Sequence, residues 1–94
     1  MIKTFADEKT GMFWETGEAP RWPPASVRKA ARRKLAMLDA ARRLNDLKSP
    51  QGNRLHELKD DREGQHSISI NDQFRLCFRQ KNGDAYEVEI ADYH

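Results

Sequence analysis

Imidazole, guanidinium and phenol side chains stand at ordered positions in the second half of the chain. His56 and Lys59 lie in the run HELK, Arg75 lies in the alternating run QFRLCFR, and DYH follows another alternating run, YEVEI. Histidine titrates near neutrality and can act as an acid or a base, while arginine holds a phosphate with a fork of N–H donors. These residue types suit metal-free cleavage of RNA, in which the 2′-hydroxyl attacks the adjacent phosphorus with help from a base, an acid and cations.

Other reactive patterns are missing from the sequence. It contains no glycine-rich phosphate loop, no nucleophile elbow and no cysteine–histidine metal spacing, so we expect neither a metal nor a cofactor. Cys77 is the single cysteine and falls in a strand-like run, which favours a structural residue in a reducing compartment. The N-terminal stretch lacks the apolar core of a signal peptide, and no run approaches the ~20 apolar residues of a membrane span. We therefore expect a cytoplasmic protein.

The elements that must position these side chains begin with two helices. A length of 94 residues predicts one domain, residues 1–94, with a modest core. We expect a short strand at residues 1–5 and a helix at residues 8–16, between an aspartate suited to cap its start and a glycine suited to end it. A proline-rich connection then leads to the longest element, a helix at about residues 25–45.

The long helix has two unlike sides. Its apolar positions recur on one side, where they would pack on a core. Basic residues gather on the other side, and with two arginines of the following segment they are the side chains that we expect to contact RNA: Arg28, Lys29, Arg32, Arg33, Arg54 and Arg62. The alternative is an ordinary solvated helix face. Lys34 interrupts the apolar side, where its stem could pack while its amine reaches water or a partner.

The rest of the chain predicts an antiparallel meander. Residues 47–65 contain structure breakers and lack a sustained period, so we expect a surface segment there. Alternation then predicts strands at residues 66–71, 73–79 and 85–91, with an Asn-Gly hairpin turn between the last two. Apolar side chains of the last two strands share one sheet face: Phe74, Leu76, Phe78, Tyr86, Val88 and Ile90. The predicted class is α+β in two layers, in the order β-α-α-β-β-β, with both helices on this face and the other face open.

Several motifs together resemble the HigB branch of the RelE/ParE toxin superfamily, the plasmid maintenance system killer proteins. They are the MIKTF start, LDAA in the long helix, HELK, GQHSISI, NDQFRLCF and the final DYH. The resemblance covers essentially the whole chain and implies a RelE/ParE-like two-layer fold. Members are toxins of type II toxin–antitoxin pairs, and the usual HigB-like activity is cleavage of mRNA on translating ribosomes. The implied partners are the ribosome, mRNA and a helix-turn-helix, HigA-like antitoxin that forms a hetero-oligomer with an otherwise monomeric toxin.

The resemblance also implies roles for single residues. The candidate catalytic set is His56, Lys59, Arg75, Asp92, Tyr93 and His94. The two histidines would share proton transfer, the lysine would bind phosphate or assist the reaction, and the arginine would stabilise charge on the scissile phosphate. The tyrosine would orient the substrate or stack on a base, and the aspartate would hold the histidines or contact the nucleotide. A terminal carboxylate on His94 would favour its protonated ring, so we expect this residue to act as the acid.

Two alternatives stay open at this point. A toxin of the ParE branch poisons DNA gyrase by contact and needs no catalytic set, and a degenerate toxin would serve only to bind its antitoxin. Single residues also have structural interpretations: Arg75 could pair with Glu87 or Glu89 across the sheet, and His66 at the start of a strand is better explained as structural. Three acidic residues stand next to His56 and Lys59 in the sequence and would weaken the attraction of RNA or favour protonated histidine: Glu57, Asp60 and Asp61.

Overall fold

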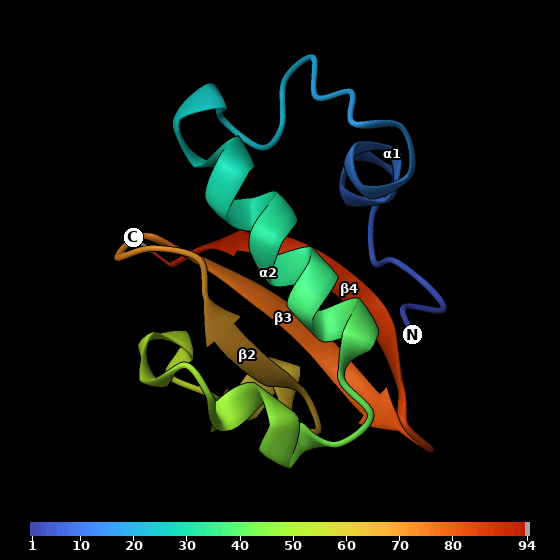
Figure 1. Ribbon diagram of the computed structural model, residues 1–94, viewed down its shortest axis with the longest axis vertical. Coiled ribbons are helices and arrows are strands. Elements are labelled where there is room, and N and C mark those ends of the chain that lie inside the picture. Colours follow the sequence, from blue (N-terminus) through green and yellow to red (C-terminus); the bar gives the residue numbers. More distant parts are fainter. Residues whose placement is uncertain (94) are drawn as a thin grey trace.

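The chain folds as a helical layer on an antiparallel sheet (Figure 1). The structure, a computed structural model, describes residues 1–93, so His94 lies outside the described residues. The helices are α1 (Glu8–Thr16) and α2 (Arg28–Ala40), and the strands are β1 (His56–Glu57), β2 (His66–Ser69), β3 (Phe74–Lys81) and β4 (Asp84–Asp92). The four strands lie in the order β1-β2-β3-β4, and each pairs with its neighbour in antiparallel fashion. The α+β class is confirmed, with two helices and a four-stranded sheet.

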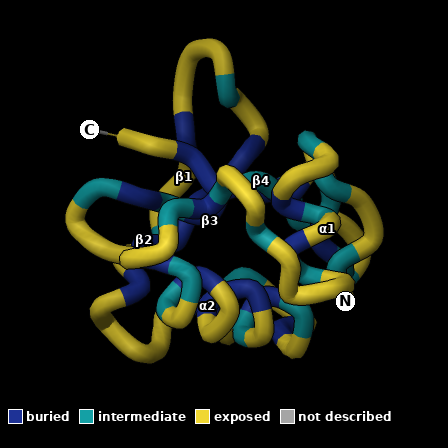
Figure 2. Tube along the Cα trace, turned by 90° about the horizontal axis from the view of Figure 1, so that it is seen from above, coloured by how far each residue is buried: buried dark blue, intermediate teal, exposed yellow. Residues whose placement is uncertain are grey.

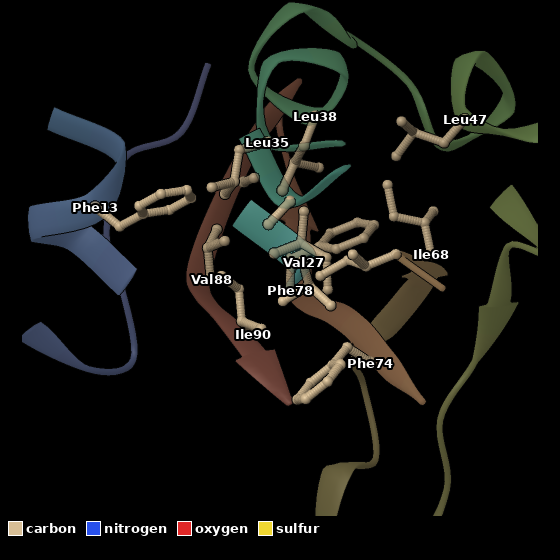
Figure 3. Packing of buried hydrophobic residues seen from close by; sticks show 14 of the residues in the cluster. Phe13, Val27, Leu35, Leu38, Leu47, Ile68, Phe74, Phe78, Val88 and Ile90 are labelled. Atoms are coloured by element: carbon tan, nitrogen blue, oxygen red, sulfur yellow. The ribbon is translucent and has the colours of Figure 1, made fainter. Parts of the chain in front are cut away.

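The core lies between α2, α1 and the strands. Leu35 and Leu38 of α2 lie in one cluster with Phe13 of α1 and Phe78 of β3 (Figure 3), and each is at most 1% exposed. Leu76 of β3 belongs to the same cluster and is 0% exposed. In Figure 2 the buried segments gather where α2 and the strands face each other. Each such side chain contributes about 1.5–3 kcal/mol by leaving water, so this layer is the main source of stability.

The predicted strand at residues 1–5 is wrong, although the segment does run beside β4. Only two isolated parallel bridges form, from Ile2 to Ala85 and from Phe5 to Val88. Between them Glu87 adopts a φ of 53°, and its amide donates to the Thr4 hydroxyl at 2.8 Å and not to a backbone carbonyl. This irregularity in β4 interrupts the ladder, so a regular first strand does not form and the order β-α-α-β-β-β is not observed.

The same irregularity changes the face of one predicted core residue. The β3–β4 register shifts between Cys77 and Arg79, so Ala85 is buried in the core at 1% exposure, while Tyr86 is half-buried outside the core cluster. The prediction that Tyr86 shares the core face with Val88 is therefore wrong. A single extra residue in a strand reverses the alternation on one side of it.

The long helix ends earlier than the predicted residue 45. A short 3₁₀ turn, Ala25–Val27, precedes α2, and the backbone becomes extended at Ala41, where ψ is 137°. The next two amides, of Arg42 and Arg43, donate to the Asp46 carboxylate at 3.0 and 3.2 Å. Asp46 thus satisfies backbone donors that would otherwise bond to carbonyls of a continuing helix.

Replacement of Asp46 by asparagine is expected to destabilise the fold in a pH-dependent way. The amide hydrogen bonds from Arg42 and Arg43 lower the pKa of Asp46 below its ordinary value of 3.8. A carboxyl with a lowered pKa in the folded state stabilises the fold above its unfolded-state pKa, and this contribution disappears as pH falls through the folded-state value. In thermal melts at pH 7, the melting temperature of Asp46→Asn should be lower than that of the parent, and the difference should disappear under acid conditions. An equal difference in melting temperature at every pH would contradict this origin.

No helix in the described part of the chain is both long and apolar enough to cross a membrane.

Candidate active site

Arg75 is the centre of a hydrogen-bonded cluster on the sheet face opposite α2. Its neighbours Phe74 and Leu76 are core residues, so alternation along β3 directs Arg75 to the other face. The side chain reaches over β2, where Nε donates to the Ser67 hydroxyl at 2.7 Å, and Nη2 donates to the Arg54 carbonyl at 2.7 Å. The third guanidinium nitrogen, Nη1, takes part in neither bond. Burial lowers the pKa of Arg75, but arginine remains charged in proteins.

His56 of β1 meets the same guanidinium. Its Nδ1 lies 3.0 Å from Arg75 Nη2 and 3.3 Å from the Arg54 carbonyl oxygen. Arginine can only donate, so Nδ1 must accept, and in the neutral ring the proton is then on Nε2. The Arg54 carbonyl already accepts from Arg75 at the shorter distance, which is consistent with this tautomer. In the unbound protein His56 therefore presents an N–H donor to whatever binds beside it.

The backbone at Arg54 directs its carbonyl into this cluster. Arg54 follows the 3₁₀ turn Gln51–Asn53 and has φ 48° and ψ 52°, a left-handed backbone conformation that residues other than glycine rarely adopt. Its side chain is exposed, which leaves the guanidinium available to a ligand. Sequence reasoning selected Arg54 for this charge, whereas the carbonyl contact was missed because nothing in the residue type indicates it.

The face that carries Arg75 is less open than predicted. Leu58 and Ala91 cover Cys77, which is 0% exposed, to form a second small apolar cluster. The Tyr93 hydroxyl lies 3.7 Å from the Cys77 sulfur. Burial raises the pKa of Cys77, and burial together with this contact raises the pKa of Tyr93 against the opposing charges of Arg62 and Arg75. Both groups are therefore neutral at pH 7.

The end of β4 is attached to the turn before β3. The Tyr93 amide donates to the Gln73 carbonyl at 2.8 Å, and Gln73 Nε2 donates to Asp92 Oδ2 at 3.1 Å. Tyr93 remains 44% exposed, so its ring can meet a ligand.

The remaining candidates of the catalytic set lie apart from these contacts or outside the description. Lys59 is exposed just before a 3₁₀ turn, and His94 is outside the described residues. The structure thus joins His56 to Arg75 directly and brings Tyr93 to the same sheet face.

Two acidic residues of β4 are paired with arginines other than Arg75. Glu89 Oε1 accepts from Arg62 Nη1 at 2.6 Å, and Glu87 pairs with Arg79 at 2.8 Å. Arg62 also donates to the Gln65 side chain at 3.2 Å, and the hydrogen bond with Glu89 raises the pKa of Arg62. The interpretation of Arg75 as the partner of either glutamate is therefore wrong, and Arg62 is held by the protein itself.

Substitution of Glu89 by glutamine is expected to strengthen RNA binding. The change removes one negative charge beside the cluster and releases Arg62 to contact a phosphate. One added phosphate contact on single-stranded RNA steepens the dependence of log K on log salt by about 0.7. Fluorescence anisotropy with a labelled oligonucleotide over a KCl series measures both the affinity and its salt dependence.

Glu87→Gln is the matched control, because it removes the same charge from the same strand but releases Arg79. Equal affinities and salt slopes for Glu89→Gln and the parent protein would refute a restraining role for Glu89.

The basic side of α2 lies away from this cluster, because the opposite side of α2 packs on the sheet. Arg28 donates to the carbonyls of Pro23 and Ala19 at 3.0 and 2.6 Å, and it thereby fixes the connection between the helices. The Arg32 guanidinium lies 5.4 Å from the centre of the Phe13 ring. Lys29 and Arg33 are exposed. The predicted RNA contacts therefore form two separate groups, one on each side of the molecule.

His66 does not join the cluster. Its ring stacks on Phe78 at 6.4 Å, and its Nδ1 is buried without a hydrogen-bond partner, which agrees with a structural residue. Across the described part of the chain, no three His, Cys, Asp or Glu side chains gather as a group able to hold a metal ion.

Residues 3–94 match the HigB-like toxin family, described as RelE-like toxin of type II toxin-antitoxin system HigB. The chain belongs to this family. It is similar to Toxin HigB-1 of Vibrio cholerae, with 39% identity over 90 residues that cover 96% of this chain and 95% of the relative. It is also similar to Endoribonuclease HigB of Proteus vulgaris, with 36% identity over 94 residues and full coverage of both chains. The family predicted from the motifs is confirmed, and its match includes every residue of the candidate catalytic set.

Proposed function

We propose that the chain is the toxin of a type II toxin–antitoxin pair and that it cleaves mRNA on translating ribosomes. The observation that carries the proposal is the Arg75 guanidinium, held between the Arg54 carbonyl and His56 on the exposed side of the sheet. A fixed cation beside an imidazole suits the transfer of a phosphoryl group with proton movement. The name of the Proteus vulgaris relative, an endoribonuclease, supports the same reaction class.

The proposed reaction needs no metal. The RNA 2′-hydroxyl loses its proton and attacks the neighbouring phosphorus, the bond to the 5′-oxygen breaks, and an acid supplies the proton that this leaving group takes. The products are a 2′,3′-cyclic phosphate and a 5′-hydroxyl end. Arg75 stabilises the charge that builds on the phosphate. Its contacts with the described residues Ser67, Arg54 and His56 use Nε and Nη2, so Nη1 is the nitrogen that would face the phosphate. His56 and His94 carry out the two proton transfers, one as base and the other as acid. Lys59 adds positive charge, and Tyr93 stacks on a nucleobase.

The two groups of basic residues support a ribosome-bound reaction. Lys29 and Arg33 are exposed on the helical side, while Arg75 lies on the opposite face of the sheet. A small domain between rRNA and mRNA would use both sides at once. Phosphate contacts on the helical side would position the protein on rRNA without recognising a base sequence. A toxin that acts on ribosomes would work in the cytoplasm, where a helix-turn-helix antitoxin would bind it in a hetero-oligomer.

The first test maps mRNA 5′ ends in cells that express the wild-type chain or Arg75→Ala. The second measures cleavage of one purified mRNA by the purified protein, with and without translating ribosomes. We expect new 5′-hydroxyl ends for the wild type alone, and cleavage in vitro only when ribosomes are present. Cleavage of naked mRNA at the same rate would refute ribosome dependence.

Growth arrest without any new ends would refute the nuclease. A gyrase supercoiling assay on the same cells would then test the ParE-like alternative, in which contact with the enzyme requires no bond between Arg75 and His56.

A further inference from the structure

A lysine is buried in the helical layer, although lysines usually lie at the protein surface. Lys34 of α2 is 6% exposed and lies among the apolar residues Ala31, Leu35 and Leu38. Its amine donates to the side-chain oxygen of Asn53, which is 0% exposed. Burial lowers the pKa of Lys34, and the neighbouring charge of Arg33 lowers it further.

Asn53 connects this lysine to the segment that leads to the active site. Its amide nitrogen donates to the Leu47 carbonyl at 3.1 Å and to the Ser49 carbonyl at 3.5 Å, and its backbone amide donates to the Pro50 carbonyl at 2.9 Å. The side chain is thus bonded at both ends. Asn53 is followed directly by Arg54, whose left-handed backbone directs a carbonyl to Arg75.

This arrangement is costly for stability. Removing an ammonium from water carries a large penalty, and here the acceptor is a neutral amide and not a carboxylate. A methionine at position 34 would pack among the same apolar residues without that penalty. The bond between Lys34 and Asn53 is therefore better explained by the geometry that it imposes on residues 53–56 than by any gain in stability.

We propose that Lys34 and Asn53 are positioning residues, which fix the Arg54 carbonyl and the His56 ring against Arg75 from the helical side of the molecule. The inference rests on the proposed nuclease function for its effect on rate. Its structural part, the orientation of His56, is independent of cleavage. The helical layer would thereby set the geometry of a site on the opposite face of the sheet, through the buried hydrogen bond from Lys34 to Asn53.

The test compares Lys34→Met with Lys34→Gln, which keeps an N–H donor for Asn53 and removes the charge. We expect Lys34→Met to fold, to keep KM within about 2-fold and to lose about 10- to 100-fold in kcat, because small misplacements of reacting groups carry losses of this order. Lys34→Gln should recover most of that loss. In ¹⁵N spectra of the imidazole, Lys34→Met should replace the single Nε2–H tautomer of His56 by a mixture, and Lys34→Gln should keep the single form.

Leu35→Val is the matched control, since it loosens the same buried side of α2 without touching Asn53. It should lower the melting temperature and leave kcat and the His56 resonances unchanged. If Lys34→Met does not fold, Asn53→Asp carries the test, because it keeps an acceptor for Lys34 and loses both donors to the Leu47 and Ser49 carbonyls. We expect that variant to show the same loss of kcat and the same change in His56.

A folded Lys34→Met or Asn53→Asp variant with parental kcat and parental His56 resonances would overturn the inference. If the wild type itself cleaves no RNA, the proposed function fails, and the His56 resonances alone decide whether the positioning role holds.

Discussion

Replacing Arg75 by alanine is expected to lower kcat for RNA cleavage by about 10²- to 10³-fold, the usual effect of removing one donor to a developing oxyanion. Arg75 is the only side chain that contacts β2, the Arg54 carbonyl and His56 within the described cluster. Its removal takes away the charge beside the phosphate and also the donor that fixes the His56 tautomer. Single-turnover cleavage on programmed ribosomes measures the first effect, and ¹⁵N imidazole spectra measure the second.

Arg75→Lys separates charge from geometry. A lysine keeps the positive charge, but its compact ammonium does not reproduce a planar fork that spans Ser67, Arg54 and His56. We expect this variant to recover less than about one tenth of the lost rate, since two of the three contacts would be missing. Arg79→Ala is the control on the same strand, because Arg79 pairs with Glu87 outside the cluster. Parental activity of a folded Arg75→Ala variant would contradict the assigned role.

The position of Arg75 on the sheet was predictable from the sequence, whereas its partners were not. Strict alternation in QFRLCFR directs Phe74 and Leu76 to the core and Arg75 to the other face, as observed. β1 contains only two residues, too few for any periodicity, so residue patterning did not place His56 beside β2. The family resemblance assigned His56 and Arg75 to one catalytic set but gave no contact between them. The contact further depends on the left-handed backbone at Arg54, which its residue type does not suggest.

Long-range polar pairs account for most of what the sequence left open. Lys34 was visible as an anomaly on an apolar helix side, but Asn53, its acceptor, is remote in sequence and ordinary in type. The charge of Arg62 suggested an RNA contact, and only the fold reveals the carboxylate of Glu89 that holds it. Such pairs form because desolvated charges must find partners, and the choice of partner is made by packing, which periodicity does not encode.

Deletion of His94 is expected to abolish growth arrest and to lower the cleavage rate by about 10²- to 10⁴-fold, the usual contribution of a general acid or base. Cleavage needs one group that takes the proton of the 2′-hydroxyl and another that supplies a proton to the 5′-oxygen, and one imidazole cannot do both in the same step. A second proton-transfer group is therefore required, and the family resemblance assigns that role to His94. The measurement is growth after induction, followed by single-turnover cleavage with the purified variant.

The fold should survive this deletion, because the described contacts at the end of β4 precede His94. The Tyr93 amide bonds to the Gln73 carbonyl, and the Tyr93 hydroxyl touches the Cys77 sulfur. Tyr93→Phe is the matched control: it loses the hydroxyl contact, keeps the ring for stacking and should lose far less activity than the deletion. If the chain without His94 arrests growth as the wild type does, proton transfer must come from another residue, and the catalytic assignment of the DYH motif fails.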